Sequence, residues 1–338
     1  GKPMREAQPL AEGSERMDAA FAALLDVCPV PYVQNDNLER AAQYNERECV
    51  IEINSSKTAS EVFAALATEI VYARDHDRGR NRDYDRADLQ LNAESVGFMV
   101  CRRFGVDLCV SEMVSAKALV YEQACRKDPL TLPSRTAPLA AVRADDTPLS
   151  VQIFGSDPQL MAQAAVMLVT GNYRGCISEL PPFAIDINMG CPMAKIVGSG
   201  DGSALLNKPE LAKSIVYAVK NAMVPYSIPV TVKMRIGFNR DDIVAVPFAK
   251  GLESAGADAV TVHGRTRQDL YAPGVRRDVI RDVREALSIP VIANGDVVDA
   301  ASAADTIAET GTSALMIGRG ALGAPWLFAQ IRAALQGK

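Results

Sequence analysis

Histidine and tryptophan are scarce in this sequence, which has two histidines and one tryptophan among 338 residues. Its seven cysteines form no Cys-x-x-Cys pair and no cluster with a histidine, so the spacing that marks a zinc site is missing. An odd number of cysteines without a signal peptide indicates reduced thiols, most of them small buried hydrophobes. We therefore expect no metal.

Long apolar runs are also missing, since no stretch approaches the roughly 18 residues that cross a bilayer. The first residues, GKPMREAQPLAEGSERMD, lack the apolar segment of a signal peptide. We expect a cytoplasmic protein with no membrane partner. The net charge of −5 comes from an acidic excess in residues 1–110, and bulk charge therefore gives no support for an RNA partner.

From residue 107 onward, one unit repeats: a short apolar strand followed by an Ala/Leu-rich helical stretch. We predict seven strands, at 107–113, 149–155, 184–190, 230–236, 259–265, 290–296 and 314–320. Strands that alternate with helices predict a parallel sheet, and near-continuous Val/Ile runs are typical of strands covered on both faces. A TIM barrel needs eight strands, so this count is one short.

Polar side chains gather where these strands end. They are Gln152, Asn188, Lys233, Arg235, His263, Arg265, Asn294, Asp296 and Arg319. In a TIM barrel the carboxyl ends of the strands form the rim on which active sites are built. The pattern predicts one site that draws on nearly every strand.

Residues 1–106 look different, because they are acidic and carry no strand–helix repeat. We predict a strand at 49–56 and helices at 58–75 and 86–105. Thr58 is a candidate N-cap with Glu61 three residues on, which is the spacing of a capping box. The sequence thus predicts an acidic, mainly helical N-terminal domain at 1–106 and a barrel domain at 107–338.

The segment DINMGCPMAKIVGSGDGSALL (186–206) closely resembles the signature of tRNA-dihydrouridine synthases. Further matches follow in the family's order. They are SEMVSAKAL (111–119), VQIFGS (151–156), VTVKMRIGF (230–238), VTVHGRTR (260–267), PVIANGD (290–296) and MIGRGALGAPWLF (316–328). The resemblance implies an α/β fold, namely a TIM-barrel-like (β/α)8 flavin barrel, here incomplete, with an N-terminal α+β segment.

The resemblance also implies an activity, the reduction of uridine in tRNA to 5,6-dihydrouridine by FMN that NADPH has reduced. Cys191 matches the family's proton donor, and a thiol with an ordinary pKa near 8.5 is mostly protonated at neutral pH. Lys233, Gln152 and His263 match residues at the flavin ring. Asn188 and Arg265 match residues near the substrate, so we assign them to substrate binding.

The segment Gly318–Gly323 has the spacing of a dinucleotide-binding loop, but such a loop needs an acidic residue about 20 positions further on. The barrel offers another interpretation, because loops after its last two strands form a phosphate site. We therefore expect Asn294, Gly295, Asp296, Gly318 and Arg319 to hold the phosphate and ribityl end of FMN.

Three features depart from the family's pattern. No counterpart is expected for the family's first barrel strand or for the helical domain that follows the barrel. Residues from about 20 to 107 resemble instead a degenerate zincin-like domain of mobile-element proteins. Where a zinc peptidase has His-Glu-x-x-His, this chain reads Thr68-Glu69-Ile70-Val71-Tyr72, which retains only the glutamate. A strand such as Val50–Asn54 is the expected filler for the missing barrel strand.

Two other functions stay open at this point. The chain is alternatively a catalytically impaired fusion protein of a mobile element that acts as a binding module. Other FMN barrels, such as dihydroorotate dehydrogenases, are a further alternative, although they do not supply the motif that runs from Asn188 to Leu206. The sequence does not indicate which tRNA uridine is modified.

Overall fold

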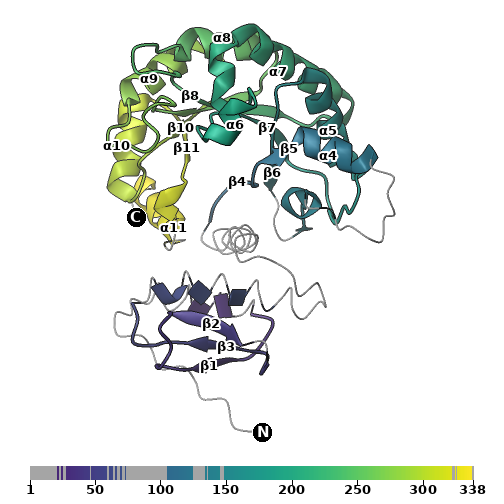
Figure 1. Cartoon of the computed structure of the whole chain (residues 1–338). Coiled ribbons are helices and arrows are strands. Elements are labelled where there is room, and N and C mark those ends of the chain that lie inside the picture. The colour runs from purple at the N-terminus through teal and green to yellow at the C-terminus, as the bar shows by residue number, and fades with distance from the viewer. Residues whose placement is uncertain are drawn as a thin grey trace. The chain divides into compact units, whose positions relative to one another are not determined.

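The chain folds into two compact units in the computed structural model, one made of Gly1–Val106 with Gly320–Lys338 and the other of Asp107–Arg319 (Figure 1). The described residues are 21, 22, 24, 25, 28–45, 47–58, 61–63, 65, 66, 69, 70, 73, 105–124, 134, 136–144, 148–321, 324 and 326–336. One boundary between the units lies between Val106 and Asp107, and the last residues cluster with the first unit.

The first unit contains a three-stranded sheet of β1 (Tyr32–Gln34), β3 (Val50–Ile53) and β2 (Ala42–Asn45), in that order. β3 pairs parallel with β1 and antiparallel with β2. The strand expected at 49–56 is therefore confirmed, but its expected role as a barrel strand is wrong. Its backbone groups are used by two neighbours of its own sheet.

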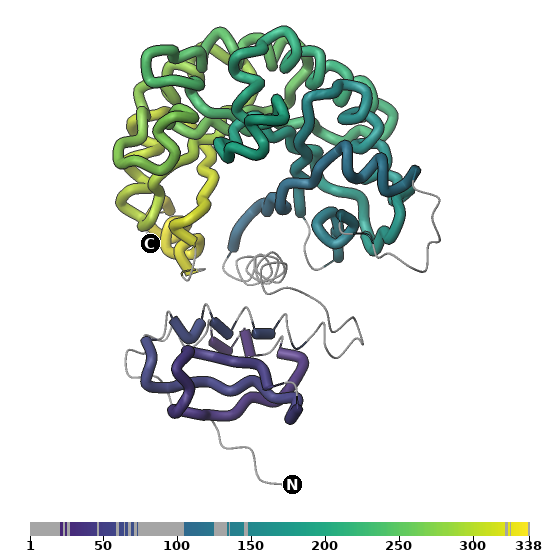
Figure 2. The backbone as a smooth tube through the Cα atoms, in the orientation of Figure 1, coloured from purple at the N-terminus to yellow at the C-terminus, as the bar shows by residue number. Residues whose placement is uncertain are grey.

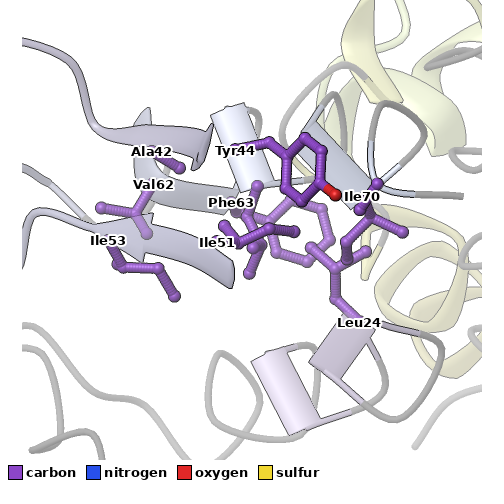
Figure 3. Packing of buried hydrophobic residues seen from close by; sticks show 10 residues of the cluster. Leu24, Ala42, Tyr44, Ile51, Ile53, Val62, Phe63 and Ile70 are labelled. Atoms are coloured by element: carbon purple, nitrogen blue, oxygen red, sulfur yellow. The ribbon is translucent and has the colours of Figure 1, made fainter. Parts of the chain in front are cut away.

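A hydrophobic core covers this small sheet. Figure 3 shows Tyr44, Ile51 and Phe63 packed together, with Leu24 and Ile70 beside them. Phe63 also contacts Trp326 from the end of the chain, edge to face, with ring centroids 6.1 Å apart. Burial of these side chains supplies the free energy that holds this unit together.

The helical residues that follow β3 begin at the predicted capping box. The backbone N–H of Thr58 donates to Glu61 at 3.0 Å, and the N–H of Glu61 donates to the Thr58 hydroxyl at 3.3 Å. Glu69 is buried, and its carboxylate accepts the backbone N–H of Tyr44 at 2.9 Å. The glutamate of the degenerate zincin motif thus has a structural partner here. The helix expected at 86–105 lies almost entirely outside the described residues.

The second unit is built on an eight-stranded parallel sheet with the order β11-β10-β9-β8-β7-β6-β4, in which β5 also pairs with β6. A strand lies within each of the seven predicted ranges, although only Cys109–Val110 of the first range is a strand, and β5 is an additional short strand just after that range. The strands are β4 (Cys109–Val110), β5 (Val114–Ser115), β6 (Leu149–Phe154), β7 (Ala184–Met189), β8 (Val230–Arg235), β9 (Ala259–His263), β10 (Val291–Asn294) and β11 (Ala314–Met316).

The helices are α4 (Ala116–Ala124), α5 (Pro158–Thr170), α6 (Ala194–Gly198), α7 (Pro209–Met223), α8 (Ala245–Ser254), α9 (Arg277–Ala286), α10 (Ala300–Thr310) and α11 (Leu327–Leu335), of which α11 belongs to the first unit. Helices α7, α8, α9 and α10 lie along the outer side of the curved sheet (Figures 1 and 2). None of the described helices is long and apolar enough to cross a membrane.

Helix α5 illustrates how the sequence sets these boundaries. Asp157 caps its first turn by accepting the backbone N–H groups of Gln159 and Leu160, Pro158 occupies the first turn, and Gly171 ends the helix in the left-handed conformation. Its buried side chains then pack against the neighbouring α7.

The strands of this unit alternate between apolar and polar residues on their two faces. In β7, Ile185, Ile187 and Met189 face one side and Asp186 and Asn188 the other, because successive side chains point to opposite faces. Every residue of β7 is buried, so the expectation of strands covered on both faces is confirmed for this strand. The polar residues are buried as fully as the apolar ones, so burial alone does not distinguish the faces.

The sheet curls into a half-barrel, which confirms the expected incomplete TIM-barrel-like fold (Figure 1). Among the described residues, no ladder joins β11 to β4, so the two ends of the strand order remain edges. All carboxyl ends of these parallel strands share one rim of the half-barrel.

Candidate active site

The polar residues expected at the strand ends lie in register on neighbouring strands. Asn188 of β7 is paired with Lys233 of β8, Arg235 of β8 with His263 of β9, and His263 with Asn294 of β10. Residues in register across a sheet present their side chains on the same face. The structure therefore brings these five side chains together at one rim.

Cys191 begins the loop that follows β7, and Asn188 holds this loop. The side-chain oxygen of Asn188 accepts the backbone N–H groups of Gly190 at 3.1 Å and of Cys191 at 2.9 Å. The carbonyl oxygen of Cys191 accepts both the N–H and the hydroxyl of Ser203, at 3.1 and 2.8 Å. Cys191 is 8% exposed, so its thiol lies in a fixed loop just below the surface.

Gly202 allows this close approach. Its φ is +58°, and a Cβ atom added there would lie 2.9 Å from the carbonyl oxygen of Cys191. A residue with a side chain would meet both backbone strain and a steric clash. The glycine in the GDGSALL part of the motif thus has a direct structural role.

A buried carboxylate, Asp186, lies one row deeper in the sheet, and the sequence did not single it out. Its oxygens accept hydrogen bonds from the side-chain amide of Gln152 at 2.6 Å and from the hydroxyl of Thr231. The other end of the Gln152 amide accepts the Asn188 side-chain N–H at 2.8 Å. An aspartate in the middle of the apolar strand AIDINM was the one signal that would have indicated it.

Lys233 lies among buried polar groups. Burial and repulsion by Arg235 lower its pKa to about 8, although Asp186 and Cys191 act in the opposite direction. Burial, with the surrounding cations Lys233, Arg235 and Arg265, lowers the pKa of His263 to about 2. His263 is therefore a neutral imidazole at physiological pH, and Lys233 is still mostly an ammonium.

Arg235 is a buried residue whose guanidinium is committed to backbone carbonyl groups. It donates to Gly190 at 2.9 Å, to Thr266 at 2.8 Å and to Leu270 at 3.1 Å. It thereby ties the loop of Cys191 to the loop that follows β9. These bonds give Arg235 a structural function.

Arg265 is 2% exposed and forms a two-pronged ion pair with Asp296. It also donates to the carbonyl of Ala272 at 2.7 Å, and its guanidinium lies 3.3 Å from Nε2 of His263. Because bidentate pairs fix geometry as well as charge, Arg265 joins the loops after β9 and β10. Its expected contact with substrate remains a prediction.

The residues expected at a phosphate site lie at the ends of β10 and β11. Asn294 donates to the carbonyl of Met316 at 2.8 Å, and Asp296 adopts a left-handed φ of +48°. The guanidinium of Arg319 lies 3.6 Å from Asp296 and 4.5 Å from the ring centroid of Tyr271. The side chain of Arg319 is 58% exposed, which leaves donors available for an anion.

No group of three metal-ligating side chains occurs within the described part of the chain. Five of the seven cysteines lie in this part, and none of these five forms a disulfide. The site is built from amide, cationic, imidazole and thiol groups together with the two carboxylates of Asp186 and Asp296, each of which has hydrogen-bond partners.

Comparison with known proteins gives one family. A model of the family described as dihydrouridine synthase (Dus) matches residues 94–338. A "Probable tRNA-dihydrouridine synthase" of Rhodobacter capsulatus is 39% identical over 236 residues, which are 70% of this chain and 66% of that protein. "tRNA-dihydrouridine synthase B" of Pseudomonas aeruginosa is 41% identical over 233 residues, which are 69% of this chain and 63% of that protein.

The matched region thus spans less than two thirds of the length of these relatives. Among solved structures, a mutant of FabK from Thermotoga maritima is matched over 52% of this chain and 45% of that chain, with 19% identity and a TM-score of 0.32. That score is too low to support a conclusion about this chain.

Proposed function

Because the chain belongs to the dihydrouridine synthase family, we propose that it reduces uridine in tRNA to 5,6-dihydrouridine, with FMN as cofactor and NADPH as electron donor. The observation that carries this proposal is the shared position of Cys191 and Lys233. Asn188, which accepts the backbone N–H of Cys191 at 2.9 Å, is paired in register with Lys233 on the neighbouring strand at the rim of the half-barrel. A proton donor next to a flavin-binding cation is the arrangement that this reduction requires.

The charges of the residues at the rim suit FMN. The ammonium of Lys233 would stabilise the negative charge of a reduced isoalloxazine, and the neutral His263 offers a hydrogen bond without adding charge. At the other end, the exposed guanidinium of Arg319 is suited to a phosphate. An added Cβ at Gly318 would meet no atom within 4 Å, so there is room for a phosphate at this backbone.

Bound FMN would supply a hydride to C6 of the uracil. Cys191 then donates its thiol proton to C5, and the resulting thiolate recovers a proton from solvent. Asn188 holds the backbone of Cys191, so the thiol keeps its place while the base enters. The neighbouring Lys233 stabilises the thiolate that remains after proton transfer.

The target uridine must leave its stack to reach a thiol that is 8% exposed, so we propose that tRNA binds with this base flipped out. FMN and the flipped base are both assigned to residues 107–338, the domain predicted from the sequence. Arg265 remains the residue proposed for contact with substrate. Asn188, whose oxygen and NH₂ group are both hydrogen-bonded within the protein, is proposed to act by holding the loop of Cys191.

The alternative, an impaired fusion protein that acts as a binding module, is not favoured. The relatives at about 40% identity carry the names of synthases, and the family model matches residues 94–338, a range that includes Cys191, Lys233 and His263.

The test begins with the visible absorption spectrum of the purified chain after addition of FMN. Flavin bands near 375 and 450 nm that stay with the protein through gel filtration, at roughly one flavin per chain, are expected. Incubation with NADPH and unmodified tRNA should then yield dihydrouridine, counted by mass spectrometry. A chain that binds flavin but leaves every uridine unreduced would contradict the proposed activity.

A further inference from the structure

Asp186 connects to Cys191 through an unbroken chain of hydrogen bonds. The strand register places Gln152 of β6 and Thr231 of β8 directly on either side of Asp186. Gln152 donates to Asp186, Asn188 donates to Gln152, and Cys191 donates its backbone N–H to Asn188. Each of the three side chains in this chain is 6% exposed or less.

The direction of these bonds follows from the carboxylate. The oxygen of Asp186 that faces Gln152 accepts, so Gln152 must direct its NH₂ group toward Asp186 and its oxygen toward Asn188. Asn188 must then direct its own NH₂ group toward Gln152. Its oxygen is left facing the backbone N–H groups of Gly190 and Cys191.

The side-chain amide of Asn188 has only one orientation that satisfies all of its hydrogen bonds. Its NH₂ group donates to Gln152 at 2.8 Å and to the sulfur of Met113 at 3.0 Å, while its oxygen accepts two backbone N–H groups. If either amide flipped, donors would face donors in a buried site, which costs about 1–3 kcal/mol for each unsatisfied group. The carboxylate of Asp186 thus requires one orientation of both amides, and it is the orientation that the two backbone N–H groups also require.

We propose that Asp186 is a positioning residue that fixes the place of Cys191 by setting the direction of every hydrogen bond between them. The proposal rests on the proposed function, since Cys191 is the proton donor there. Asp186 also interacts electrostatically with Lys233. An alternative role of Asp186 is therefore to compensate the positive charge of this lysine. The two roles differ in one respect: the hydrogen-bond chain needs an acceptor, whereas charge compensation needs a negative charge.

Asp186→Asn and Asp186→Leu separate these roles. Asparagine keeps an oxygen for Gln152 and offers its NH₂ group to the Thr231 hydroxyl, so the chain persists without the charge. Leucine removes the acceptor. We expect Asp186→Asn to form dihydrouridine within about threefold of the wild type, and Asp186→Leu to lose roughly 10²-fold, because a small displacement of a reacting group has that effect. Reduction of bound flavin by NADPH, which does not use Cys191, should change less than about twofold in both.

A second measurement needs no turnover. The full chain is treated with iodoacetamide, and the alkylation rate of the Cys191 peptide is compared with that of buried Cys109 by mass spectrometry. Asp186→Leu should change the rate at Cys191 roughly tenfold, since thiol reactivity follows exposure and local charge. Asp186→Asn should leave it within about twofold.

Gln152→Met breaks the same chain one link further on and should reproduce the alkylation change if Asp186→Leu does not fold. Thr231→Val is the matched control, because it removes the bond on the far side of Asp186 and should leave Cys191 unaffected. Equal alkylation of Cys191 in wild type, Asp186→Leu and Gln152→Met would overturn the proposal. So would an Asp186→Asn protein that behaves as Asp186→Leu does. A wild-type chain that makes no dihydrouridine would contradict the proposed function. The alkylation rates would still test whether Asp186 positions Cys191.

Discussion

The backbone N–H of Cys191 donates to the side-chain oxygen of Asn188 at 2.9 Å, across only three residues of the chain. This bond closes the turn that carries the thiol out of strand β7. Because the same oxygen also accepts from Gly190, the loop depends on one amide for two buried donors.

We therefore expect Asn188→Ala to lower the free energy of unfolding by roughly 1–3 kcal/mol, the cost of leaving buried donors unsatisfied. Urea unfolding followed by circular dichroism measures this change. Asn172→Ala is the control, since Asn172 is exposed and its side chain lies outside the site. Equal losses in the two variants would show that the turn does not depend on Asn188.

Cys191→Ala separates proton donation from flavin chemistry. Dihydrouridine formation should fall by roughly 10²–10⁴-fold, the usual contribution of a positioned general acid. Stopped-flow reduction of bound FMN by NADPH should remain within about twofold, because the thiol takes no part in that half-reaction. Cys49→Ala, at an exposed position in the other unit, should affect neither rate. An unchanged dihydrouridine yield in Cys191→Ala would remove this thiol from the mechanism.

Lys233 should make stability depend on pH. Its folded pKa of about 8 lies below the value of 10.5 for an unperturbed lysine, so the unfolded state holds the proton more tightly. Between these pH values the unfolded chain binds more protons, and stability rises with pH. The favourable contribution is complete above pH 10.5 and is lost as the pH falls through about 8.

Relative to Lys233→Met, the wild type should therefore gain up to about 3 kcal/mol in free energy of unfolding between pH 7 and pH 10.5, at 1.36 kcal/mol per pKa unit. Urea unfolding of both proteins across this range is the measurement. A difference between them that does not vary with pH would show that the ammonium is as well solvated as in water.

Arg319→Ala should weaken FMN binding by about 1.5–3 kcal/mol, because it removes a charge-assisted hydrogen bond to the phosphate. Fluorescence titration with FMN and with riboflavin, which has no phosphate, measures this effect. Only the FMN affinity should fall. Arg276→Ala removes an arginine of similar exposure that pairs with Asp278, and it serves as the control. An equal loss of riboflavin affinity would show that Arg319 does not bind the phosphate.

The strands of the second unit could be predicted because each is a local apolar run bounded by turn residues. The strands β1 and β2 could not, since Tyr32–Gln34 and Ala42–Asn45 are short and rich in polar residues. The prediction that Val50–Ile53 pairs with the barrel strands was also wrong, because strand pairing depends on contacts between distant segments. In the site, the resemblance identified Cys191 and Lys233, whereas the role of Asp186 depends on the register of three strands.

The first unit is assembled from both ends of the chain, and this affects the order in which the protein can fold during synthesis. The ring of Trp326 packs on Phe63, and the Arg332 guanidinium donates to the carbonyl of Gly105 at 2.5 Å. Some 200 residues of half-barrel are translated between these partners. A ribosome that makes about 5–20 residues per second needs at least ten seconds or so for that stretch. Phe63 therefore gains its contact with Trp326 only after the half-barrel has been translated.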